Sequence, residues 1–115
     1  MNQTKIYCFD IDGTLCDNTE GDYKNATPHT DVIEEVNRLY EAGNTIYMMT
    51  ARGSTTGIDW KETTENQLMS WNVKYHKLCM SKPTADVYID DKAINAVAWR
   101  KSRFQLSLAD SKGKT

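Results

Sequence analysis

The feature that most constrains this chain is an apolar run that ends in two aspartates, Tyr-Cys-Phe-Asp-Ile-Asp-Gly-Thr over residues 7–14. Because the run lacks polar alternation, residues 5–10 are predicted to form a buried strand of a parallel sheet. Gly13 indicates a sharp turn directly after the strand. Two carboxylates crowded at a strand end repel each other unless a cation or a proton relieves them. Asp10 and Asp12 therefore favour a Mg²⁺ site, and an Asx-type turn that caps the next segment is the alternative.

The rest of the chain alternates strand-like and helix-like segments. Further strands are predicted at residues 45–49, 78–80, 85–89 and, as a half-exposed edge, 104–108. Helices are predicted from Thr27-Pro28 to Gly43, from about Trp60 to 71, and over 92–101 with Ile94, Val97 and Ala98 directed inward. The polar stretch 13–26 is predicted to be a flap. This order predicts an α/β fold with a doubly wound, Rossmann-like parallel sheet, whose ligands bind beyond the carboxyl ends of the strands.

Composition sets limits on the class of protein. At 115 residues the chain is predicted to be a single domain, residues 1–115, with a frayed tail at 109–115. A formal net charge of −2 gives no general electrostatic reason to bind nucleic acid or an anionic membrane. The sequence contains neither an apolar stretch long enough to span a membrane nor a signal-peptide core near its start, so we expect a cytoplasmic protein. The three cysteines lack metal-type spacing, and Cys8 is expected to be a small core residue.

Three more polar clusters follow predicted strands or the loops that lead to them. They are Thr50 with Arg52, then Lys82, then Asp90 with Asp91. Each is weak alone, because such a threonine usually caps a helix, a lysine is usually solvated, and paired aspartates often lie in turns. Together with Asp10 and Asp12, in this order, they resemble the four motifs of the haloacid dehalogenase (HAD) superfamily, most members of which are Mg²⁺-dependent phosphatases. The resemblance covers nearly the whole chain.

The resemblance implies a role for each matching residue. Asp10 would be the nucleophile that forms an aspartyl-phosphate, and Asp12 the acid and then the base. Mg²⁺ would be held by the side chain of Asp10, the backbone carbonyl of Asp12, and Asp90, with Asp91 assisting through water. Thr50 would hydrogen-bond a phosphoryl oxygen, and Lys82 would offset the negative charge. One departure is Asn95, where many relatives place an acidic residue.

The substrate is less constrained. The segments between motifs leave no room for the cap domain that many HAD enzymes carry, so the chain resembles capless members. An open site suits a large substrate, whereas oligomerisation would close it over a small one. Ala51 and Arg52 are expected to contact the substrate, with Arg52 binding its phosphate bidentately or, equally, making a surface salt bridge. We expect a small phosphorylated metabolite, such as a sugar phosphate of surface-polysaccharide synthesis.

Three alternatives stay open at this point. A polynucleotide 3′-phosphatase has a similar arginine and a similar Asp-Asp-Lys run, but this chain lacks a basic stripe with interleaved aromatic residues. A signalling receiver domain uses comparable residues in a different order, with the acidic pair first. A HAD-derived binding module without catalysis is the third alternative, although every catalytic position holds a competent residue.

Overall fold

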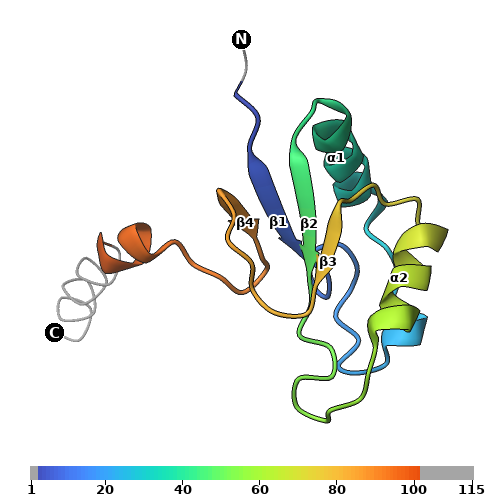
Figure 1. The fold of residues 1–115 in the computed structure, drawn as a ribbon. Helices are drawn as coiled ribbons and strands as arrows, with labels where there is room; N and C mark the ends of the chain where they lie inside the picture. The colour runs from blue at the N-terminus through green and yellow to red at the C-terminus, as the bar shows by residue number, and fades with distance from the viewer. Residues whose placement is uncertain (1–2, 102–115) are drawn as a thin grey trace, which may run out of the picture.

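The computed structural model describes residues 3–101, which form a four-stranded, all-parallel sheet in the order β3-β2-β1-β4 (Figure 1). The strands are β1 (Ile6–Asp10), β2 (Thr45–Met49), β3 (Lys77–Cys79) and β4 (Val87–Ile89). The chain moves outward from β1 through β2 and β3, and then returns to the opposite side of β1 for β4. This reversal is the feature that gives doubly wound sheets their ligand sites, at the crevice where the order switches. The predicted α/β class and the four predicted strands within residues 3–101 are confirmed.

Two α-helices pack on one face of this sheet. They are α1 (Thr30–Glu41) and α2 (Lys61–Ser70), and a short 3₁₀ turn, η1 (Tyr23–Asn25), precedes α1 (Figure 1). The core that joins the layers contains Phe9, Ile46 and Met48 from the sheet, with Ile33 and Val36 from α1 and Leu68 from α2. Phe9 pairs with Met48 in register, so these sheet residues share a face. The face of α1 with Ile33 and Val36 and the face of α2 with Leu68 therefore cover the sheet.

The start of α1 differs from the prediction. The helix begins at Thr30 with His29 as its N-cap residue, and Thr27 is not the cap. The backbone N–H of Thr27 donates instead to Asp17 Oδ1 at 2.7 Å, and the Thr27 carbonyl accepts from the Asp17 N–H at 3.0 Å. Because Thr27 is paired across the base of the flap, it is not available to start a helix.

The helix predicted at residues 92–101 begins later than expected. Only residues 96–101 are helical, because the Asn95 side chain accepts the N–H groups of Val97 at 3.0 Å and Ala98 at 3.1 Å and so caps the helix there. This turn of helix lies away from the sheet (Figure 1), with Ile94 70% and Val97 62% exposed and Ala98 exposed as well. The prediction that Ile94, Val97 and Ala98 point inward was wrong. The predicted strand at 104–108 and the tail at 109–115 lie outside the described residues.

Within residues 3–101, no helix combines the length and the apolar character needed to cross a membrane.

Candidate active site

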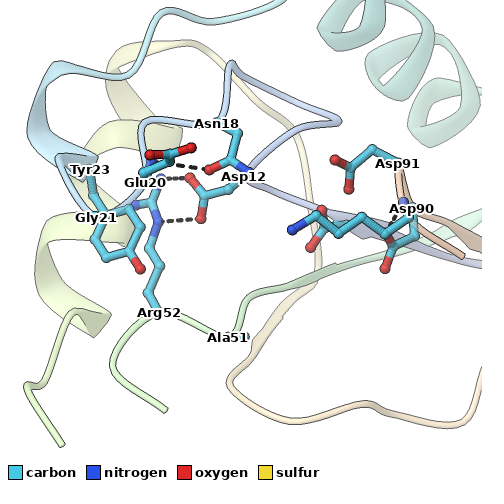
Figure 2. Close-up of a pocket in the computed structure, with 11 residues that line it drawn as sticks. Asp12, Asn18, Glu20, Gly21, Tyr23, Ala51, Arg52, Asp90 and Asp91 are labelled. Carbon is cyan, nitrogen blue, oxygen red and sulfur yellow. Dashed lines mark hydrogen bonds and ion pairs between the residues drawn. The ribbon is translucent and has the colours of Figure 1, made fainter. Parts of the chain in front are cut away.

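A cavity of about 420 Å³ opens beyond the carboxyl ends of β1 and β4. It lies at the switch point of the sheet, where the loops after β2 and β4 meet the flap, which follows β1. Six of the residues selected from the sequence line it: Asp10, Asp12, Ala51, Arg52, Asp90 and Asp91. In Figure 2, Asp12 and Arg52 lie on one side of the cavity, and Asp90 and Asp91 lie on the other.

The side of the cavity with Asp90 and Asp91 contains a cluster of three carboxylates. One oxygen each from Asp10, Asp90 and Asp91 lies within 4.8 Å of the other two. They meet because β1 and β4 are adjacent and parallel, with Phe9 opposite Ile89, so Asp10 and Asp90 leave the sheet side by side. Burial, together with the neighbouring charges of Asp90 and Asp91, raises the pKa of Asp10 to about 7.

This donor set fits a hard divalent cation. Mg²⁺ prefers carboxylate oxygens and keeps several waters, and the cluster offers three carboxylates beside an open cavity. A cation would also relieve the repulsion that raises the pKa of Asp10. The residues present therefore suit the metal that the sequence predicted.

Gly13 lets the loop after β1 pass close to this cluster. Its φ is +93°, and a Cβ atom there would lie 2.2 Å from Asp91 Oδ2. Any side chain at this position would collide with a carboxylate of the cluster, in addition to straining the backbone. The glycine of the Asp-x-Asp-Gly-Thr motif is thus required by the site as well as by the turn.

The opposite side of the cavity contains an ion pair between Asp12 and Arg52. Arg52 Nε donates to Asp12 Oδ2 at 2.9 Å, and Nη2 donates to Oδ1 at 2.8 Å, which makes the pair bidentate. The side chain of Arg52 is completely buried, whereas that of Asp12 is 18% exposed and faces the cavity. Both oxygens of Asp12 are therefore held by a guanidinium that is shielded from solvent.

Groups from α2 and the flap hold Arg52 in turn. Its Nη1 donates to Thr64 Oγ1 at 3.1 Å and to Gln67 Oε1 at 2.6 Å. The ring of Tyr23 stacks on the guanidinium, with Cζ 4.6 Å from the ring centroid. Sequence reasoning missed this support, because Thr64 and Gln67 have no motif and Tyr23 lies in a polar loop.

The predicted bidentate contact of Arg52 with a substrate phosphate does not match this geometry. Four hydrogen bonds, to Asp12, Thr64 and Gln67, use four of the five N–H groups of the guanidinium. The one that is left cannot bind a phosphate bidentately. The alternative, a helix-end or surface salt bridge, is correct in part: Arg52 forms a salt bridge with Asp12, but it is only 3% exposed and does not lie on the surface.

The remaining two predicted residues do not line the cavity. Thr50 is buried, its Oγ1 accepts the backbone N–H of Arg52 at 3.0 Å, and its own N–H donates to the Cys79 carbonyl at 3.1 Å. The Lys82 ammonium lies over the ring of Tyr88, 4.5 Å from the centroid. Their catalytic roles stay predictions.

Other residues line the cavity that the sequence did not single out. Lys92 follows the acidic pair directly, and Asn18, Glu20 and Tyr23 come from the flap. Glu20 has a left-handed φ of +54°, and its N–H donates to Asn18 Oδ1 at 3.1 Å. The Asp-Asp-Lys run was a usable signal for Lys92, whereas nothing in the polar stretch marked particular flap residues.

Cysteine-based chemistry is disfavoured near this site. Burial raises the pKa of the Cys8 thiol to about 11 and that of Cys16 to about 12. Neither is a thiolate at neutral pH, so neither is a nucleophile. Cys8 is 1% exposed, which confirms it as a core residue.

These features define the class of the protein: an α/β protein with an all-parallel sheet and an acidic cluster, able to hold a metal ion, at its switch point. No protein-family model and no curated protein matches the chain. The chain is similar to a Vibrio cholerae protein of known crystal structure, described as an MCSG target, with 28% identity and a TM-score of 0.61. The match covers 84% of this chain and 87% of that one, so the two share the fold over most of their length.

Proposed function

We propose that this protein is a Mg²⁺-dependent phosphomonoester hydrolase of the HAD type, which acts through an aspartyl-phosphate. The observation that carries the proposal is the grouping of three carboxylates at the ends of β1 and β4, with Asp12 fixed beside them. Phosphoryl transfer through aspartate requires a group of carboxylates that holds a metal ion and a separate carboxylate that transfers protons. The cluster that contains Asp10 suits the first role, and Asp12 suits the second.

Asp10, Asp90 and Asp91 would hold the Mg²⁺ ion. When bound, the ion would offset the negative charge on the phosphoryl oxygens and keep Asp10 in its ionised form. Lys92, which also lines the cavity, supplies a further positive charge for the phosphoryl group.

In the first step, a carboxylate oxygen of Asp10 attacks phosphorus, and the bond from phosphorus to the leaving oxygen breaks. That oxygen takes a proton from Asp12, which enters this step in its protonated form, with the proton on a lone pair that Arg52 does not occupy. In the second step, a water molecule gives a proton to Asp12 while the oxygen of that water attacks phosphorus. The bond between phosphorus and Asp10 then breaks. Inorganic phosphate leaves, and both aspartates return to their starting forms.

The flap favours a small leaving group without negative charge. Asn18 offers an amide and Glu20 a carboxylate, and both groups hydrogen-bond hydroxyl groups. The carboxylate of Glu20 also repels anions. Across the whole lining, five acidic side chains face two basic ones, Arg52 and Lys92. A sugar phosphate suits this cavity better than a polynucleotide 3′-phosphate does, because a polynucleotide carries further charge.

The proposal is tested by Mg²⁺-dependent phosphate release over a panel of sugar phosphates, nucleotides and 3′-phosphorylated DNA. We expect release from the wild-type protein, none after chelation, and a loss of more than about 10³-fold in Asp10→Asn, which lacks the nucleophile. Asp31→Asn, on the exposed surface of α1, is the matched control and keeps full activity.

Glu20→Gln sharpens the choice of substrate. If Glu20 rejects anionic leaving groups, its neutralisation raises the ratio of nucleotide to sugar-phosphate kcat/KM several-fold. If the wild-type protein released no phosphate from any substrate of the panel but bound Mg²⁺ by calorimetry, the result would instead support a binding module that lacks catalysis.

A further inference from the structure

We infer that Arg52 is a positioning residue for Asp12, held by α2 and the flap, and that it does not bind the substrate. The inference rests on the proposed function, since Asp12 is the proton-transfer group of that reaction. Its basis is the bidentate pair, in which the plane of the Asp12 carboxylate is fixed by hydrogen bonds of 2.9 and 2.8 Å. A single hydrogen bond would leave the carboxylate free to rotate, whereas two parallel ones define both its plane and its direction.

The pair still leaves Asp12 able to move a proton. A carboxylate has about four lone-pair positions, and Arg52 takes one on each oxygen. Asp12 is 18% exposed and lines the cavity, so its remaining lone pairs are open to a substrate. Arg52 thus fixes the direction of the carboxylate without blocking it.

Arg52 is itself fixed from two sides. Thr64 Oγ1 and Gln67 Oε1 accept from Nη1, and Thr64 is 0% exposed, which gives the guanidinium a rigid anchor on α2. To bind a phosphate bidentately, Arg52 would have to break at least one of its bonds to Asp12, Thr64 or Gln67, because only one of its five N–H groups is free. Such a rearrangement is costly for a buried charge.

The flap contributes the other side of the anchor. Tyr23 stacks on the guanidinium, its ring meets Trp60 edge to face at 4.9 Å, and its carbonyl accepts the Gln67 side-chain N–H. Asn18 and Glu20 of the same flap line the cavity. A substrate that contacts the flap therefore contacts the segment that holds Arg52, and through it the segment that orients Asp12.

A test follows from the two tasks of Asp12. With p-nitrophenyl phosphate the leaving group departs as p-nitrophenolate and needs no proton, so only the second step depends on Asp12. With a sugar phosphate, both steps depend on it. A residue that acts through Asp12 should affect these two substrates differently, whereas a residue that binds the phosphoryl group should affect them alike.

We would measure Arg52→Lys and Arg52→Gln by rapid mixing with p-nitrophenyl phosphate. The expected result is a burst of one p-nitrophenolate per protein molecule at a rate within about tenfold of the wild type, followed by turnover about 10²-fold slower. Acid quenching should trap phosphate on the protein. With a sugar phosphate the same variants should show no burst and a loss of about 10²-fold or more in kcat. Loss of the burst, with KM raised equally for both substrates, would overturn the inference in favour of phosphate binding.

A double-mutant cycle gives a second, independent measurement. If Arg52 acts only through Asp12, adding Arg52→Gln to Asp12→Asn lowers kcat less than about threefold further, and additive losses would contradict the inference. Gln67→Leu, which leaves Arg52 in place but removes one anchor, should give a weaker form of the same burst. It keeps the inference testable if the Arg52 variants do not fold. An inactive wild-type protein would count against the proposed function, whereas an active one with unaffected Arg52 variants would count only against this inference.

Discussion

The carboxylates on the two sides of the cavity have opposite electrostatic surroundings. Asp10, Asp90 and Asp91 face one another, and the pKa of Asp10 is raised to about 7 by burial and by these neighbours. Asp12, two residues further along the chain, has both oxygens paired with a fully buried arginine. One set of charges is left for an external ion to neutralise, and the other is neutralised by the fold itself.

This difference separates two tasks. A carboxylate that binds a metal needs free lone pairs, at some cost to the stability of the metal-free protein. A carboxylate that transfers a proton needs a fixed direction, which a bidentate arginine supplies. Figure 2 shows Asp12 and Arg52 on one side of the cavity and Asp90 and Asp91 on the other, as the proposed division of tasks requires.

The largest expected effect comes from making the same substitution on each side. Asp12→Asn should destabilise the protein by about 3 kcal/mol, because it leaves the buried charge of Arg52 without its counter-ion. Asp10→Asn should stabilise the metal-free protein by on the order of 1 kcal/mol, because it removes one of three repelling charges. Urea unfolding at pH 7.5 in the presence of a chelator measures both.

Asp31→Asn on α1 is again the control, and its free energy of unfolding should stay within about 0.5 kcal/mol of the wild type, as for most surface changes. If Asp10→Asn and Asp12→Asn changed stability in the same direction, the proposed division of the cavity would be incorrect.

A second effect concerns pH. The pKa of Asp10 rises from its ordinary value of 3.8 to about 7 in the folded protein, so the folded state holds a proton that the unfolded chain has lost between these values. The metal-free protein should therefore lose stability as pH rises from about 4 to about 7. Since Asp10 is partly exposed, we expect a loss on the order of 1–2 kcal/mol rather than the full value of the shift.

Thermal unfolding between pH 4 and 8 checks this. The difference between the wild type and Asp10→Asn isolates the contribution of Asp10, because other titrating groups are common to both. Added Mg²⁺ should reverse the trend, since the ion binds the ionised carboxylates more tightly as pH rises. A difference that does not change with pH would show that Asp10 is ionised throughout.

The sequence predicted the strands better than the helix ends. The apolar runs of β1 and β2 are local and unbroken, and β2 matches its predicted range of Thr45–Met49. The predicted start of α1 was wrong because Thr27 pairs with Asp17 across the flap, a contact that no local pattern encodes. The helix after β4 begins late because Asn95 caps it, although periodicity alone favoured an earlier start.

The site shows the same limit. The carboxylates Asp10 and Asp90 were predictable, because parallel strands that end in polar residues bring them to one edge. The partner of Arg52 was not, because its choice between a substrate and Asp12 depends on Thr64 and Gln67, which belong to a different element. Motifs identified the carboxylates that line the cavity, whereas the residues that hold Arg52 against Asp12 become visible only through tertiary contacts.

The smallest of the three effects tests how closely the loop after β1 approaches the metal cluster. Gly13→Ala would place a methyl group 2.2 Å from Asp91 Oδ2, so the Asp91 side chain must move. We expect the Mg²⁺ affinity, measured by calorimetry, to fall about tenfold, or about 1.4 kcal/mol. Gly57→Ala is the matched control, because Gly57 also has a positive φ, of +76°, but nothing lies within 4 Å of the added Cβ. It should share the backbone strain and keep its Mg²⁺ affinity. If both variants lost affinity equally, the effect would come from strain in the fold, and Asp91 would not be a ligand whose position Gly13 sets.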